Sequence, residues 1–232
     1  MRIGLFATCV ADTMFPDAAR ATATILERLG HEVVVPAEQT CCGQMHMNSG
    51  YRREAQPLAD RFLEAFGDFD AVVSPSSSCV GAIRDLYGQL LGIEHPVLKR
   101  TMELSELLVH RLGLEDLGAT YPHRVTYHPT CHSLRVTRIG DAPLRLLRNV
   151  NQLELVELPN ATECCGFGGT FSLKNADTSS AILADKCSSI DSTGADVCTA
   201  VDGSCLLQIG GGLSRGGMRA QAVHLAEILV SR

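Results

Sequence analysis

The feature that most constrains this chain is a pattern of cysteines that occurs twice. Each occurrence consists of a single cysteine, an adjacent pair followed by glycine, and a second single cysteine. Corresponding cysteines lie 122 to 126 residues apart: Cys9 with Cys131, Cys41 and Cys42 with Cys164 and Cys165, and Cys79 with Cys205. Self-similarity at a nearly constant offset indicates that one structural unit has been used twice.

The segments before these cysteines repeat as well. Three apolar, β-prone runs of the first half match three of the second: "RIGLFATC" (2–9) with "RVTYHPTC" (124–131), "HEVVVPAEQTCCG" (31–43) with "LELVELPNATECCG" (153–166), and "FDAVVSPSSSC" (69–79) with "GADVCTAVDGSC" (194–205). The segments between the runs have apolar residues at helical spacing. Each half is therefore predicted to run strand, helix, strand, CCG loop, helix, strand, cysteine.

The helices expected from this spacing cover 15–30, 57–67, 79–91 and 101–113, and a final helix over 218–230 follows a flexible glycine-rich turn at 210–217. Alternating strands and helices of this length favour a parallel sheet covered by helices. We predict an α/β fold of two pseudo-symmetric Rossmann-like halves, each with a small parallel sheet. The halves span 1–120 and 121–232 and form one compact unit.

Composition excludes several classes of protein. The chain is 45% hydrophobic, which is enough for a substantial core, and its net charge of -6 is spread without a block of like charge that would bind nucleic acid. No run approaches the roughly 18 to 20 apolar residues of a membrane span. The N-terminus does not resemble a signal peptide, so we expect a cytoplasmic protein. In a reducing compartment, ten cysteines favour metal or redox chemistry over disulfides.

The repeated cysteines follow the predicted strands, and ligand sites of parallel sheets gather beyond the carboxyl ends of the strands. Thiolates select zinc, copper(I) and iron–sulfur clusters. Successive side chains on an extended backbone diverge, so an adjacent pair suits a larger cluster better than a single zinc ion. Buried cysteines that act as small hydrophobes would not produce a doubled pattern. Cys187 and Cys198 fall outside the repeat and are interpreted as structural thiols.

The motifs "YHPTCHSLR", "CCGFGGTFSLK", "TGADVCTAVDGSCLLQIGG" and "HLAEIL" resemble the lactate-utilisation protein A family of the CCG cysteine-rich domain superfamily, over nearly the whole chain. This superfamily also includes one of the subunits of heterodisulfide reductase. The resemblance implies an oxidoreductase subunit that transfers electrons, through one or two iron–sulfur clusters, while a multi-subunit complex oxidises L-lactate to pyruvate. The implied partners are a larger ferredoxin-type iron–sulfur subunit and a third small subunit, with a 2-hydroxy acid as the substrate of the system.

The resemblance carries metal ligation to the eight repeated cysteines: Cys9, Cys41, Cys42, Cys79, Cys131, Cys164, Cys165 and Cys205. The wider CCG motif ends in CxxC, but Ala82 and Gln208 stand where its last cysteine would be. The cluster type therefore stays open between a cubane, a smaller cluster, a non-cubane cluster with a non-cysteine ligand, and one vacant half.

Other residues are expected beside the cluster. Gly43 and Gly166 let the backbone turn and bring an amide near sulfur, and His128 and His132 bracket Cys131 as candidates to ligate metal, to move a proton or to donate a hydrogen bond to sulfur. Arg135 and Lys174 are weaker candidates for a substrate carboxylate. Two alternatives remain: a non-catalytic zinc-stabilised scaffold, and a CCG subunit of a related 2-hydroxy-acid oxidase or heterodisulfide reductase-like complex.

Overall fold

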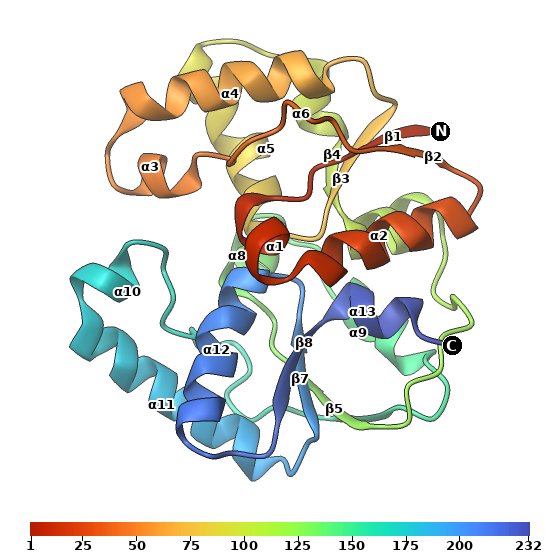
Figure 1. Cartoon of the computed structure of the whole chain (residues 1–232), viewed down its shortest axis with the longest axis vertical. Helices are drawn as coiled ribbons and strands as arrows, with labels where there is room; N and C mark the ends of the chain where they lie inside the picture. The colour runs from red at the N-terminus through yellow and green to blue at the C-terminus, as the bar shows by residue number, and fades with distance from the viewer.

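The computed structural model describes all 232 residues and alternates strands with helices in two similar series. The first series contains β1 (Arg2–Leu5), α1 (Cys9–Met14), α2 (Pro16–Arg28), β2 (Glu32–Val34), α3 (Gln44–Asn48), α4 (Arg52–Phe66), β3 (Ala71–Ser74), α5 (Ser77–Leu91), α6 (Pro96–Arg100), β4 (Thr101–Glu103), α7 (Leu104–Glu106) and the π-helix η1 (Leu107–Arg111). The second contains β5 (Arg124–Tyr127), α8 (Cys131–Arg135), α9 (Ala142–Arg148), β6 (Glu154–Val156), α10 (Phe171–Lys174), α11 (Ala176–Ser192), β7 (Val197–Ala200), α12 (Gly203–Arg215), β8 (Gln221–His224) and α13 (Leu225–Val230). Figure 1 shows the two series one above the other.

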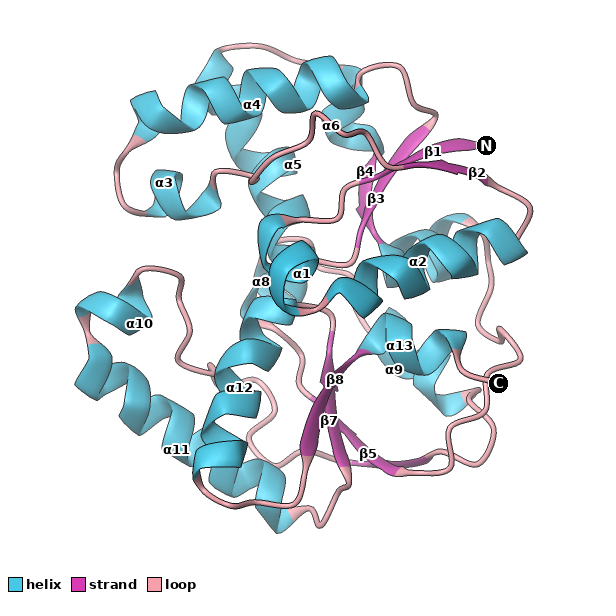
Figure 2. Cartoon of the chain, viewed as in Figure 1, coloured by secondary structure: helices cyan, strands magenta, loops and turns pink.

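Each series builds a four-stranded parallel sheet, and the two sheets have the same topology. The strand orders are β2-β1-β3-β4 and β6-β5-β7-β8. The registers correspond too, because Ile3 pairs with Ala71 in the first sheet and Val125 pairs with Val197 in the second. The predicted α/β class, with two parallel sheets covered by helices, is confirmed (Figure 2).

One hydrophobic core joins the two sheets. Its largest cluster contains Ile3 and Val73 from the first sheet and Val125 and Val197 from the second. Helices α2 and α13, one from each series, pack side by side and contribute to the same cluster (Figure 1). Burial of apolar side chains from both series in one core contributes about 25 cal/mol per Å², so the halves stabilise each other.

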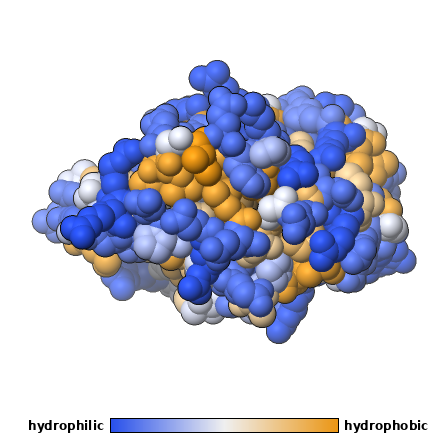
Figure 3. Space-filling model, turned by 90° about the horizontal axis from the view of Figure 1, so that it is seen from above, coloured by the Kyte–Doolittle hydropathy of each residue, from blue (hydrophilic) through white to orange (hydrophobic).

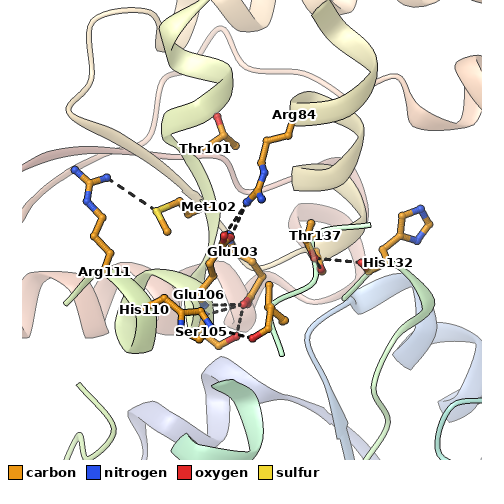
Figure 4. Close-up of polar contacts among 12 residues, drawn as sticks. Arg84, Thr101, Met102, Glu103, Ser105, Glu106, His110, Arg111, His132 and Thr137 are labelled. Carbon is orange, nitrogen blue, oxygen red and sulfur yellow. Dashed lines mark hydrogen bonds and ion pairs between the residues drawn. The ribbon is translucent and has the colours of Figure 1, made fainter. Parts of the chain in front are cut away.

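The fourth strand of each sheet differs from the sequence-based prediction. The segments 101–113 and 218–230 are each predicted to be helical, but each contains a short strand, β4 or β8, that leads directly into a helix. A capping box marks both transitions: the side chains of Glu103 and His224 accept hydrogen bonds from the first turn of the following helix. Figure 4 shows Glu103 with Ser105 and Glu106, and the two-pronged contact of Arg84 with Glu106. Strands of three and four residues are too short to interrupt the helical periodicity of these segments. β4 and β8 form because they pair with the edges of β3 and β7.

The structure differs from the sequence-based prediction at two further helices. Helix α4 begins at Arg52, before Pro57, which lies inside it. Residues 210–215 continue α12 to Arg215 and do not form the expected turn. A Cβ atom on Gly212 would lie 2.7 Å from the Cys187 sulfur, so this glycine permits the close packing of α11 against α12. Gly212 therefore allows close helix packing, whereas the sequence predicts that it belongs to a flexible turn.

The outer surface mixes hydrophilic and apolar areas. The face in Figure 3 is largely hydrophilic, with hydrophobic patches between the polar residues. Leu173 in α10 is the most exposed of the large hydrophobic side chains, at 83%. None of the helices combines the length and the apolar character that crossing a bilayer requires.

Candidate metal centre

The four repeated cysteines of the first half come together in two close pairs. The Sγ atoms of Cys9 and Cys41 are 3.5 Å apart, and those of Cys42 and Cys79 are 3.3 Å apart. Cys9 begins α1 after β1, the adjacent pair lies in the loop after β2, and Cys79 lies in the first turn of α5 after β3. Parallel strands end at one edge of their sheet, so residues distant in the sequence meet there.

The four repeated cysteines of the second half occupy the matching positions with a more open geometry. The Sγ atoms of Cys131 and Cys164 are 3.9 Å apart. Cys165 and Cys205 form a buried group with His128, in which the possible ligand atoms all lie within 4.8 Å of one another. The second half therefore adds a histidine to its sulfur donors.

Glycine follows each cysteine pair in a left-handed backbone conformation. Gly43 has φ of 72° and Gly166 has φ of 87°, a region that side chains make costly. Their amides point at sulfur: the N–H of Gly43 donates to Cys41 at 3.4 Å, and the N–H of Gly166 donates to Cys164 at 3.3 Å. The glycines are therefore placed to stabilise negative charge on these two sulfur atoms.

The close contacts between the thiols shift their pKa values in opposite directions. Hydrogen bonds from Cys42 and then from Cys9 lower the pKa of Cys41 to about 2. In the second half, hydrogen bonds from Cys131 and then from Cys165 lower the pKa of Cys164 to about 2. The same hydrogen bonds, with burial, raise the pKa values of their partners Cys9 and Cys131. One thiolate is favoured in each half, and further deprotonation needs a cation nearby.

All eight repeated cysteines line one cavity, which we call the central cavity. The space between its lining atoms, the open mouth included, is about 980 Å³. The N-termini of α5 and α12, two of the longer helices, lie at this cavity, and their dipoles favour thiolate. Figure 1 shows α1, α5, α8 and α12 meeting near the middle of the molecule. The fold thus places both sets of sulfur donors around one space.

Polar contacts between the halves border the central cavity. The side-chain nitrogen of Gln44 lies 2.8 Å from Nε2 of His132, and the hydroxyls of Ser49 and Thr170 are 2.9 Å apart. Thr137 donates a side-chain hydrogen bond to the carbonyl of His132 (Figure 4). His132 is therefore held at the junction of the halves, on the wall of the cavity.

A buried carboxylate between the halves was not anticipated from the sequence. Asp202 accepts hydrogen bonds from the hydroxyl of Ser76 and the amide of Ser78, both at 2.9 Å, and from the hydroxyl of Thr130 at 2.6 Å. Asp202 and Ser76 occupy matching places, each three residues before the last cysteine of its half. A polar residue at the same position of both halves was the sequence signal that could have identified Asp202.

Several other candidates lie away from the central cavity. Arg135 and Lys174 are exposed and do not line it, so neither is placed to bind a small carboxylate there. Cys187 and Cys198 are buried in a hydrophobic cluster and also do not line it. Four sulfur donors in each half, with glycine amides near two of them, fit a site for a soft metal centre.

Comparison with known proteins agrees with this arrangement. The cysteine-rich domain model, CCG, matches residues 3–84 and 125–210, which contain both sets of cysteines. Lactate utilization protein A of Oceanobacillus iheyensis is 43% identical over 99% of this chain and 96% of its own length. This chain belongs to the lactate utilization protein A family. Within that family, lactate utilization protein A of Bacillus pumilus is 44% identical over the full length of both chains.

Solved structures show only a distant likeness. A glutamate racemase from Bacillus anthracis is 10% identical over 99% of this chain and 78% of its own, with a TM-score of 0.38. A glutamate racemase from Francisella tularensis in complex with D-glutamate is 8% identical, covers the same shares of the two chains, and has a TM-score of 0.40. These values are too low to relate this lactate utilization family member to racemases in function.

Proposed function

We propose that this chain is the iron–sulfur subunit of an L-lactate-oxidising complex and transfers electrons as L-lactate is converted to pyruvate. The observation that carries the proposal is the central cavity, which two matched sets of four cysteines line. The names of the full-length relatives supply the connection to lactate utilisation. The proposal therefore combines a site suited to soft metals with membership of a family named for lactate utilisation.

The chain's residues would divide the work of holding the centre. The eight repeated cysteines bind iron, and the amides of Gly43 and Gly166 donate hydrogen bonds to sulfur. Asp202 holds the loops of the two halves in place through Ser76 and Thr130. An iron–sulfur cluster bound there would accept and pass on electrons one at a time.

The resemblance to the family extends the proposal to partners. The implied partners are a larger ferredoxin-type iron–sulfur subunit and a third small subunit, in the cytoplasm. This chain has cysteines for only one or two clusters, so the electrons would leave it for clusters of the partners. The mouth of the central cavity, bordered by Gln44 and His132, is where a small 2-hydroxy acid would approach the metal. A related 2-hydroxy-acid oxidase would use the same site with a different substrate.

Anaerobic purification followed by metal analysis tests the proposal. We expect iron and acid-labile sulfide bound to the chain, and visible absorption and electron paramagnetic resonance that change on reduction by dithionite. L-lactate should reduce the iron only when the partner subunits are present. Protein that contains stoichiometric zinc, with neither iron nor sulfide, would refute the proposal.

The close thiol pairs favour one competing function, a zinc-stabilised scaffold. Two sulfurs on one tetrahedral ion, with bonds of about 2.3 Å, are about 3.8 Å apart, close to the 3.3 to 3.9 Å of the three cysteine pairs. In a scaffold, the metal would serve folding alone, and a chelator would unfold the chain. Zinc is silent in absorption and paramagnetic resonance, so the same purification separates the two functions.

A further inference from the structure

His128 is a buried imidazole for which the protein supplies no hydrogen-bond partner. It follows β5 directly, its exposure is 0%, and neither ring nitrogen has a partner. A buried polar group without a partner typically costs about 1 to 3 kcal/mol, and such groups are rare in folded proteins. An imidazole in this state calls for a ligand that the amino acids alone do not provide.

The neighbours of His128 indicate what that ligand is. One ring nitrogen lies within 4.8 Å of the sulfur atoms of Cys165 and Cys205, which are also within 4.8 Å of each other. Donors bound to one tetrahedral ion at about 2.0 to 2.3 Å are about 3.5 to 3.8 Å apart, so each separation needs to close by no more than about 1 Å. Small side-chain rotations therefore suffice for all three residues to reach one metal ion.

The first half has no counterpart to this histidine. Phe6 occupies the matching position, because its amide donates to Val73 in β3 as the amide of His128 donates to Thr199 in β7. The ring of Phe6 packs edge-on against Phe62, with centroids 5.4 Å apart. A phenylalanine cannot bind metal, so the first half has sulfur donors only at this level of the sheet.

The residue that replaces the last cysteine of the CxxC motif supplies no metal ligand in either half. Ala82 is buried and apolar. Gln208 donates a hydrogen bond to the hydroxyl of Ser179, which in turn donates to the carbonyl of Gly166, so Gln208 supports the CCG loop from outside the cavity.

We propose that His128 is a ligand of the metal centre in the second half, beside Cys165 and Cys205, while the first half binds its metal through cysteine alone. This inference rests on the proposed function.

The assignment has a consequence for electron transfer. A neutral imidazole gives a metal less negative charge than a thiolate does, and replacement of cysteine by histidine ligands raises the reduction potential of iron–sulfur centres. The centre of the second half should therefore have the higher potential of the two. Electrons that enter at the first half would move downhill toward the second.

Pulsed paramagnetic resonance of protein labelled with ¹⁵N-histidine tests the assignment directly. We expect a strongly coupled histidine nitrogen in the anaerobically purified chain. The coupling should disappear in His128→Phe, which introduces the residue of the first half, and persist in His132→Asn, the control at the histidine that lines the central cavity. His128→Cys should keep the full iron content, lose the nitrogen coupling and lower the potential of one centre.

The outcomes separate this inference from the proposed function. Full iron without a strongly coupled nitrogen, or a coupling that survives in His128→Phe, overturns the role of His128 and leaves the iron–sulfur function standing. A potential that does not change in iron-loaded His128→Cys also overturns it. Absence of iron from the unaltered protein overturns both. If His128→Phe does not fold, His128→Cys alone decides, because it keeps a metal-binding side chain at the site.

Discussion

The two halves of the chain have the same sheet topology and the same four cysteine positions, yet they differ in what surrounds the sulfur atoms. The first half holds its cysteines in two close pairs beside the aromatic ring of Phe6. The second half is more open at Cys131 and Cys164 and has His128 in place of the ring. The repeat thus preserved the cysteine positions and allowed the neighbouring side chains to diverge, so the two sites need not have the same chemistry.

The same divergence appears where the halves meet. Ser76 and Asp202 hold matching positions, but only Asp202 is an acceptor that receives hydrogen bonds from both halves. Glu103 and His224 cap matching helices, one with a carboxyl group and the other with an imidazole. Substitutions at matching positions can therefore test the halves against each other.

The largest expected effect follows from removing one cysteine of each adjacent pair. Cys42→Ala and Cys165→Ala should each lose about half of the bound iron, since each half is expected to bind its own metal. Iron and acid-labile sulfide per chain, measured after anaerobic purification, provide the readout. Cys187→Ala is the matched control and should keep all its iron, because this thiol does not line the central cavity. Loss of all iron from either single variant would mean that one cluster is shared.

A smaller difference is expected between the two glycines that follow the pairs. Gly43→Ala should destabilise the protein by about 1 to 2 kcal/mol, the cost of a left-handed backbone with a side chain, because the atom nearest to its Cβ would be the flexible end of Leu58 at 3.3 Å. In Gly166→Ala the Cβ would lie 2.6 Å from the backbone oxygen of Ser179. That clash should add about 1 to 3 kcal/mol. Urea unfolding of the metal-free variants measures both values, and equal losses would contradict this account.

A further expected effect is a pH dependence of opposite sign in the two helix caps. Burial raises the pKa of Glu103 to about 8, so its carboxyl destabilises the fold increasingly as pH rises from about 4.5 to about 8. Burial lowers the pKa of His224 below 6.5, so the stability that this neutral cap provides is present above about pH 6.5 and is lost as pH falls.

Variants that cannot titrate isolate these two contributions. Glu103→Gln should be increasingly stabilised relative to the unaltered chain as pH rises, and His224→Gln as pH falls below 6.5. Differences in unfolding free energy between each variant and the parent cancel the titration of all other groups. A difference that stays constant from pH 5 to pH 8.5 would show that the capping side chain does not change its proton affinity on folding.

Much of the fold could be predicted from the sequence, but the ends of the elements could not. The apolar runs before Cys9 and Cys131 form β1 and β5 because β-branched and apolar residues suit buried parallel strands. β4 and β8 lie in segments predicted as helices, since three or four residues carry too little periodicity to be distinguished. The sequence predicts a turn at Gly212 because it does not reveal that α11 packs closely against this residue.

The candidate site divides in the same way. The sequence by itself determined the repeat and the eight candidate sulfur donors, through the doubled cysteine pattern, and the α/β class, through the alternation of strand and helix patterns, because chemical type and spacing are properties of the chain. Only the tertiary structure decided that both sets line one cavity, that Asp202 bridges the halves, and that His128 is buried without a partner beside Cys165 and Cys205. These facts depend on distances between residues far apart in the sequence, which are set when the two sheets pack around a common core.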